Sequence, residues 1–477
     1  MNRIWTLVIL ASCFFVSGAK AQTAADPDQR IWTVEVDSRV MQYGISRTGV
    51  LFVLTKKAIA GWRVDSGQEA WRVELPLSDL AILGVDAGIA RNGKGLVALD
   101  LDTGERLWTL EALPLSELKG ILRATDKVAF AFGPVDEKTF RVIGFEFATG
   151  RVIWSSDSIA AGDGKAKDVF LFTYRVALPD STLILAFNRG GIVRVDATTG
   201  AVLWRLDPKL KFSIGWPPAN GLEQQYGFGS AEPLVSGDYM VTTSGTINIK
   251  SGSIAWRVPE KPSGWTSALT QTSRGVLTIR ASSGDRRALQ LIDPATGSGV
   301  WSKPLILKGL LAHTIRENTI FVAVDGGLAA IDLSTGMPLK QMQLPDFTSH
   351  EKPLSVRSLS GGDFLLESAT NLMRVTPAGS LVFHLHYGVP MVGFRPLNGV
   401  VIPPTRNPEN LTYVHTNDTD PLGQKGIVLI DPERGRELGT VRRKDRAPSY
   451  AIDAMTRLAV AIEDRRLTGF RFAPLPK

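Results

Sequence analysis

Short runs of alternating apolar and polar residues recur along the chain, each followed by a turn that contains glycine. The segments Ile192 to Asp196 and Leu291 to Asp293 alternate in the manner of half-buried β-strands and are rich in β-branched side chains. The repeating segments show this two-residue period without helical spacing. The pattern therefore predicts an all-β protein.

The same phrase, Asp-x-x-Thr-Gly, closes the apolar strands, and an aromatic residue often follows four positions after the glycine. The clearest copies end at Gly104, Gly200 and Gly297, and Gly150 also fits well. Weaker copies end at Gly67, Gly252, Gly336, Gly379 and Gly435, which gives nine in all. Asp and Thr side chains bond the local backbone in a type I turn, and glycine accepts the left-handed conformation of the bulge that follows. Each phrase therefore predicts a hairpin between two strands.

The spacing of these glycines predicts the architecture. Successive glycines lie 37 to 56 residues apart, which is room for four short strands and their turns. The first module gives four such strands, Arg39–Ser46, Val50–Lys56, Ala58–Val64 and Ala70–Leu75. Four-stranded antiparallel modules that repeat at this length are typical of β-propeller blades.

The two ends of the chain predict how the ring closes. Ile31–Val36 has the pattern of an outer strand with no preceding turn, and Leu467–Phe472 has the pattern of a third strand with no fourth after it. Pairing them would complete one blade and leave no open edge in the ring. Nine turns and this shared module predict ten blades; a ring of eight is the alternative if the degenerate Gly252 and Gly379 copies are not blades.

The N-terminal residues predict export. Arg3, the apolar run Ile4–Val16 and the small-x-small pattern Ala19-Lys20-Ala21 predict a signal peptide over residues 1–21, which leaves residues 22–477 for the propeller. No later run approaches the roughly 18 apolar residues of a membrane-spanning helix.

Cys13 is the only cysteine, and it lies inside this predicted signal. A chain cleaved after Ala21 would have no disulfide, no thiolate metal site and no covalent haem attachment. Leu10-Ala11-Ser12-Cys13 also resembles a bacterial lipobox, so the alternative is a lipid anchor on Cys13 at the outer membrane.

The net charge of +7 is small for 477 residues, and the basic residues are scattered. The densest cluster, Arg442-Arg443-Lys444, is followed at once by Asp445. Nucleic-acid-binding proteins concentrate positive charge in a patch or motif, so we expect no nucleic-acid partner.

The repeated phrases resemble those of the pyrroloquinoline-quinone-type propellers, a family that includes quinoprotein alcohol dehydrogenases and the outer-membrane assembly factor BamB. The resemblance covers roughly residues 30 to 473. It implies that the phrase joins the third and fourth strands of a blade and that the aromatic residue docks on the neighbouring blade. The anchors that it implies are Trp71, Trp108, Trp154, Trp204, Trp256 and Trp301, with Phe383 in the aromatic place of a further copy.

The dehydrogenases of that family hold their quinone with adjacent cysteines, an acidic base and a calcium or similar ion. The predicted mature chain has no cysteine and no acidic constellation that we can match to theirs. It also lacks a phosphate-binding loop, a Gly-x-Ser-x-Gly elbow and a His-Glu-x-x-His motif. The sequence therefore predicts no catalytic residue, no cofactor and no metal site.

Two segments come nearest to a metal site. His384 and His386 share one face of a predicted strand, but no further ligand is evident among His313, His350 and His415. We interpret them as ordinary strand histidines. The oxygen-rich segment 417–420 lacks the glycine and distal glutamate of an EF-hand and is interpreted as a turn.

Two long excursions, residues 207–231 and 402–425, interrupt the repeat and are candidates for binding loops, with tolerated insertions as the alternative. The leading hypothesis is an exported, monomeric, non-catalytic propeller that binds protein partners in the bacterial envelope. A divergent quinone-dependent periplasmic dehydrogenase is one alternative. The other is a carbohydrate- or surface-binding propeller that uses aromatic residues such as Trp216 and Trp265.

Overall fold

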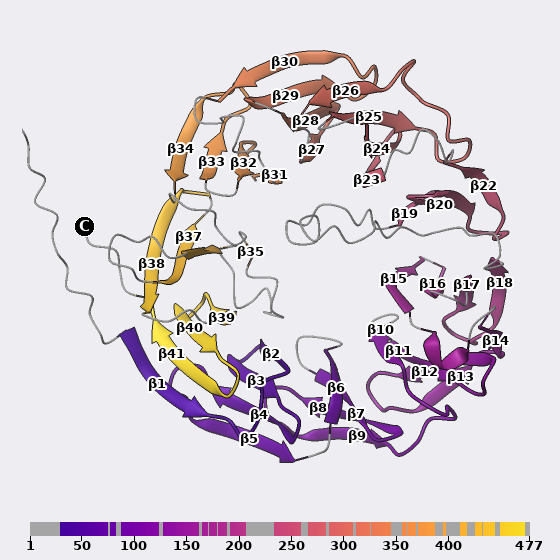
Figure 1. The fold of residues 1–477 in the computed structure, drawn as a ribbon, viewed down its shortest axis with the longest axis vertical. Helices are drawn as coiled ribbons and strands as arrows, with labels where there is room; N and C mark the ends of the chain where they lie inside the picture. Colours follow the sequence, from indigo (N-terminus) through magenta and orange to yellow (C-terminus); the bar gives the residue numbers. More distant parts are fainter. Residues whose placement is uncertain are drawn as a thin grey trace, which may run out of the picture.

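Ten antiparallel sheets, nine of four strands and one of five, follow one another around a ring in the described part of the chain (Figure 1). The structure is a computed structural model. It describes residues 29–74, 77–82, 87–123, 127–161, 165–169, 171–178, 180–187, 191–206, 233–258, 266–282, 286–308, 312–324, 326–344, 355–359, 361–368, 371–386, 395–396, 411–416, 425–431, 433–443 and 449–472.

Nine of these sheets are built from four consecutive strands, so that the chain runs outward through each blade. The first five are β2 (Gln42–Ile45), β3 (Val50–Leu54), β4 (Ala58–Arg63) and β5 (Glu69–Glu74); β6 (Leu77–Ile82), β7 (Ala87–Asn92), β8 (Gly95–Asp100) and β9 (Arg106–Leu110); β10 (Gly120–Arg123), β11 (Val128–Pro134), β12 (Thr139–Glu146) and β13 (Val152–Ser155); β15 (Leu171–Ala177), β16 (Thr182–Phe187), β17 (Gly191–Asp196) and β18 (Val202–Leu206); and β19 (Leu234–Ser236), β20 (Tyr239–Thr242), β21 (Gly245–Asn248) and β22 (Ile254–Arg257).

The next four have the same order. They are β23 (Thr266–Thr272), β24 (Gly275–Ala281), β25 (Arg286–Ile292) and β26 (Leu305–Lys308); β27 (His313–Arg316), β28 (Thr319–Val324), β29 (Gly327–Asp332) and β30 (Pro338–Gln343); β31 (Ser355–Ser358), β32 (Phe364–Glu367), β33 (Asn371–Val375) and β34 (Leu381–His386); and β35 (Arg395–Pro396), β36 (Thr412–Thr416), β37 (Lys425–Asp431) and β38 (Arg436–Arg443). A short strand, β14 (Ile159–Ala160), also pairs with β12, and a 3-10 helix, η2 (Ala166–Asp168), precedes β15.

The tenth sheet joins the two ends of the chain. Its order is β1 (Arg30–Glu35), β41 (Arg466–Arg471), β40 (Leu458–Ile462) and β39 (Ser449–Asp453). In Figure 1 the N-terminal β1 lies beside the C-terminal β41, and Val34 pairs with Leu467 in an antiparallel register. The predicted pairing of the ends is confirmed, and so is the count of ten modules rather than eight.

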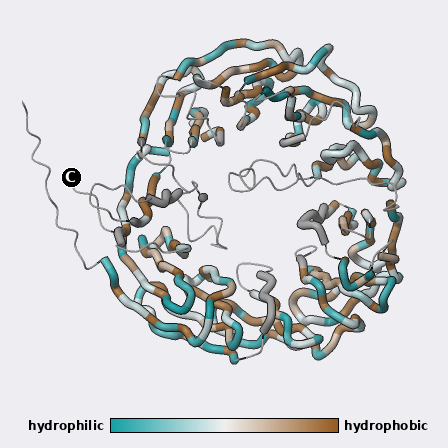
Figure 2. Tube along the Cα trace, viewed as in Figure 1, coloured by the Kyte–Doolittle hydropathy of each residue, from teal (hydrophilic) through white to brown (hydrophobic). Residues whose placement is uncertain are grey.

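The hydrophobic core is distributed among the blade interfaces. In Figure 2 hydrophobic residues recur along the strands of successive blades. The buried residues form ten clusters, and each cluster combines side chains from two neighbouring sheets. Phe130 and Phe140, for example, pack with Leu183 and Val193 of the next blade. Each blade therefore has two apolar faces and depends on both neighbours to bury them.

The nine repeat glycines adopt the backbone conformation that the sequence predicts. All nine have φ values between 63° and 91°, and eight of the outer strands that follow have a register shift typical of a β-bulge. Because an L-residue with a side chain rarely adopts this φ, glycine closes the turn at little steric cost.

Several predictions lie outside the described residues: the signal peptide over 1–21 with Cys13, and the excursion 207–231. Most of the excursion 402–425 lies outside as well, although β36 falls within it. Within the described part of the chain, no helix is long and apolar enough to cross a membrane.

Candidate functional site

The repeat turn is held by its own polar side chains, as the copy that ends at Gly200 shows. Oδ1 of Asp196 accepts the backbone N–H groups of Thr198 and Thr199 at 2.7 and 3.0 Å. The N–H of Gly200 donates to the carbonyl of Asp196 at 2.8 Å. The hydroxyl of Thr198 also donates to this carboxylate and lowers the pKa of Asp196. The turn therefore presents a rigid glycine toward the neighbouring blade.

Tryptophans of the outer strands stack on these glycines. A Cβ added to Gly150 would lie 2.4 Å from Cε3 of Trp108, which belongs to the preceding blade. The indole Nε1–H of Trp108 donates to the carbonyl of Phe147 in the same turn at 2.9 Å. The indole thus fills the contact with its ring and satisfies its polar atom across the interface.

The same contact recurs around the ring. The other tryptophan and glycine pairs are Trp32 with Gly67, Trp71 with Gly104, Trp154 with Gly200, Trp204 with Gly252, Trp256 with Gly297 and Trp301 with Gly336. The docking role predicted for six tryptophans is confirmed, and Trp32 adds a seventh. Five of these further tryptophans also donate to a turn carbonyl, namely Trp32, Trp154, Trp204, Trp256 and Trp301. Trp71 differs, because its buried Nε1 has no hydrogen-bond partner.

Two interfaces replace the tryptophan. Met342 occupies the place over Gly379, and Nζ of Lys340 donates to the carbonyl of Ala378 at 2.7 Å. Phe383 lies against Gly435, as its position in the repeat predicts. Met342 escaped sequence analysis because it lies six residues after its glycine rather than four, on the same face of β30 as position four.

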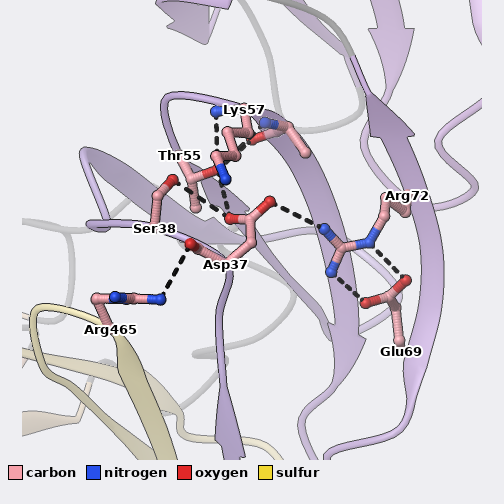
Figure 3. Close-up of polar contacts among 8 residues, drawn as sticks. Asp37, Ser38, Thr55, Lys57, Glu69, Arg72 and Arg465 are labelled. Atoms are coloured by element: carbon pink, nitrogen blue, oxygen red, sulfur yellow. Dashed lines mark hydrogen bonds and ion pairs between the residues drawn. The ribbon is translucent and has the colours of Figure 1, made fainter.

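A polar network fastens the two ends of the chain near Asp37, which follows β1 (Figure 3). Its Oδ1 accepts the hydroxyl of Thr55 at 3.0 Å, and its Oδ2 lies 3.3 Å from Nη1 of Arg72. The guanidinium of Arg465, from the C-terminal end of the chain, donates to the carbonyl of Asp37 at 3.2 Å. This cluster ties the terminal blade to blade β2–β5.

Arg72 also forms a fork with Glu69, with donor–acceptor distances of 2.9 and 2.6 Å. On the neighbouring outer strand β1, Glu35 lies 2.9 Å from Nε of Arg466 on β41. The carboxylates of Asp37, Glu69 and Glu35 at this junction therefore have basic partners within the protein.

The histidine that sequence analysis considered as a ligand has a structural partner. Nε2 of His384 lies 2.6 Å from Oδ1 of Asn371, and since that oxygen only accepts, the histidine donates. His313 on β27 lies 2.7 Å from the hydroxyl of Thr270 on β23, and burial lowers the pKa of His313 to about 4. The side chain of His386 lies outside the described residues.

Among the residues that the structure describes, no three His, Cys, Asp or Glu side chains gather as metal ligands. Trp216, Trp265, His350 and the 417–420 segment lie outside the described residues, as does the side chain of His415.

The outer strands carry a surface feature that sequence analysis missed. The residue immediately before each aromatic position, three after the glycine, is apolar in every blade: Ile31, Ala70, Leu107, Ile153, Leu203, Ala255, Val300, Leu339, Val382 and Leu438. Ile153 and Leu438 are half-buried, and the other eight are exposed. Neighbouring residues of a strand point to opposite faces, so these side chains cannot share the aromatic contact. We call this set the outer apolar row.

The signal for this row was present in the sequence. Alignment of the nine phrases on their glycines shows the apolar position as clearly as the aromatic one. Its exposure could not be predicted, because an apolar residue beside a docking tryptophan is ordinarily expected to be buried as well.

The chain also matches a protein-family model. The family model described as outer membrane protein assembly factor BamB matches residues 20–171, 138–274 and 243–358. No curated protein sequence matches the chain.

The solved structures that match the chain are distant from it. BamB from Moraxella catarrhalis is 14% identical with a TM-score of 0.33, and the alignment covers 74% of this chain and 98% of that one. A quinohemoprotein alcohol dehydrogenase from Pseudomonas putida HK5 is 12% identical with a TM-score of 0.32, with 72% and 71% covered. The computationally designed Ika8 protein is 14% identical with a TM-score of 0.34, with 71% and 96% covered.

Proposed function

The chain belongs to the family of the outer membrane protein assembly factor BamB, and from this premise we propose that it is a non-catalytic scaffold for protein interactions in the bacterial cell envelope. The observation that supports the proposal is the outer apolar row on a rigid ring. Each of the ten blades has an apolar residue at this position of the repeat, and eight of these side chains are exposed. Contiguous exposed apolar surface is typical of protein contact sites, and Leu339 of this row lies two residues from the exposed Met337.

The proposal assigns export to residues 1–21 and places the mature chain in the periplasm, or at the outer membrane if Cys13 is lipidated. Mass spectrometry of the protein purified from cells distinguishes the two forms. An N-terminus at Gln22 indicates a free periplasmic protein, and a lipid-modified Cys13 indicates an anchored one. A full-length chain that retains Met1 would contradict export.

The scaffold role is tested by purification of the full chain from envelope extract, in parallel with and without added pyrroloquinoline quinone and calcium. A protein partner that co-purifies in stoichiometric amount supports the proposal. A bound chromophore with dye-linked electron transfer would overturn it in favour of a dehydrogenase. Retention on polysaccharide without any protein partner would favour a carbohydrate-binding propeller instead.

A further inference from the structure

The ten outer strands differ in charge in a way that divides the ring into two parts. The three outer strands around the junction of the chain ends, β38, β1 and β5, contain Glu437, Glu35, Glu69 and Glu74. The other seven, which are consecutive around the ring, contain no Asp or Glu: β9, β13, β18, β22, β26, β30 and β34. We call these seven strands the acid-free arc.

Basic and apolar side chains occupy the acid-free arc in place of carboxylates. Its basic residues are Arg106, Arg205, Arg257, Lys308 and Lys340. Its most exposed apolar residue is Leu339 on β30, with 58% of its surface exposed, and Met337 just before that strand is 65% exposed. The arc therefore offers positive charge beside apolar surface, which complements a ligand that is both acidic and apolar.

β30 is the strand of the arc that is most open to a partner. Five of its six residues are exposed, and in its sheet it is the last strand, paired only with β29. One backbone edge of β30 thus faces away from the sheet. Pro338 and Lys340 are residue types that protect edge strands from pairing with copies of themselves. A lysine excludes another basic edge but attracts an acidic one.

From these observations we propose that the acid-free arc binds an extended acidic segment of a partner protein, which adds as a further strand to the open edge of β30. Backbone hydrogen bonds would give such a segment its register, and alternate side chains would give it specificity. Its apolar side chains would cover Leu339 and Met337, and its carboxylates would face Lys340 on β30 itself. An anionic membrane shares the charge complementarity, but a flat bilayer offers no partner for a strand edge on a convex rim. This inference rests on the proposed scaffold function and names the partner's chemistry.

The test uses the full chain and a labelled peptide that alternates glutamate and valine, with a lysine and valine peptide and phosphatidylglycerol vesicles as separate probes. We expect the acidic peptide to bind, to bind more weakly as salt rises, and to protect amides of residues 338–343 from hydrogen exchange. Failure of the acidic peptide to bind, equal binding of the basic peptide, or protection confined to other strands would overturn the proposal. So would binding to vesicles without binding to the peptide.

Two matched variants locate the site. Leu339→Asp places a carboxylate at an exposed position of the acid-free arc, and Ala70→Asp places one at the equivalent exposed position of β5, outside the arc. We expect Leu339→Asp to weaken peptide binding at least tenfold and Ala70→Asp to leave it within twofold, with circular dichroism unchanged in both. An equal effect of the two variants would contradict the assignment to β30.

The outcome is separable from that of the proposed function. If an envelope partner still co-purifies with the Leu339→Asp variant, the scaffold role stands and the acid-free arc is not its site. If the wild-type chain captures no partner and carries a chromophore, the scaffold role itself is wrong.

Discussion

The stacking of tryptophan on glycine can be tested by one added methyl group. Gly150 has a φ of +71°, and a Cβ placed on it would lie 2.4 Å from Cε3 of Trp108 and 2.6 Å from its Cδ2. Gly150→Ala therefore combines two costs. The left-handed conformation costs an L-residue about 1–2 kcal/mol, and an overpacked contact costs a further ~1–3 kcal/mol. We expect a total loss of roughly 2–5 kcal/mol in the free energy of unfolding.

Gly93 supplies the matched control. It has a φ of +60°, and a Cβ placed on it would meet no atom within 4 Å. Gly93→Ala therefore has the conformational cost without the steric clash. The difference between the two variants in the free energy of unfolding then gives the contribution of the clash with the indole.

The measurement is urea unfolding of the full chain followed by near-ultraviolet circular dichroism. Gly150→Ala is also measured in a chain that already carries Trp108→Ala. Because the indole is absent there, the added methyl group should no longer lower the free energy of unfolding through overpacking. The assignment of the contact is wrong if Gly93→Ala and Gly150→Ala lower the free energy of unfolding equally. It is also wrong if Gly150→Ala lowers this free energy as much with Trp108→Ala as without it.

Three further predictions follow from single contacts. Trp108→Phe should cost about 1 kcal/mol more than Trp71→Phe in urea unfolding, because only Trp108 loses a cross-blade hydrogen bond, and equal costs would contradict this. His313 is neutral in the fold with its pKa lowered from 6.5 to about 4, so the unfolded chain alone takes up the proton between these values. The contribution of His313 to stability should therefore fall as the pH falls from 6.5 toward 4, by about 3 kcal/mol at most. His313→Gln should remove this contribution and leave the part of the dependence that carboxylates such as Asp196 cause, and an unchanged pH profile in that variant would refute the assignment. Deletion of residues 30–37 should lower the melting temperature severely, because it removes β1 and the Trp32 contact with Gly67, and an unchanged melting temperature would show that β1 is dispensable.

The repeat made the fold predictable because each of its residues has a local physical role. Aspartate and threonine close the turn on their own backbone, glycine takes the left-handed φ, and the tryptophan occupies a fixed place on the strand that follows. All of these depend on positions a few residues apart, so they can be recognised without tertiary information. The pairing of Ile31–Val36 with Leu467–Phe472 was also predictable, because each end lacks the strand that the other supplies.

The candidate site was less predictable because it depends on what the ring leaves uncovered. The hydrogen bond between His384 and Asn371 joins adjacent strands and follows from their register, which the sequence did not specify. Met342 replaces a tryptophan from a shifted position, a substitution that depends on the shape of one interface. The exposure of Leu339 depends on how far neighbouring blades separate at the rim, a property of the whole ring.

The junction of the chain ends explains why charge is distributed unevenly around the rim. Elsewhere a covalent turn connects the third and outer strands of a blade, but β1 and β41 are held by pairing and packing alone. Glu35 on β1 and Asp37 just after it supply the ion pairs Glu35 with Arg466 and Asp37 with Arg72 across that junction. Exposed ion pairs contribute little individually, on the order of 0–1 kcal/mol each, but they do favour one register and exclude wrong partners for these edges. Outer strands away from this junction have no such requirement, which leaves the acid-free arc available for recognition of another chain.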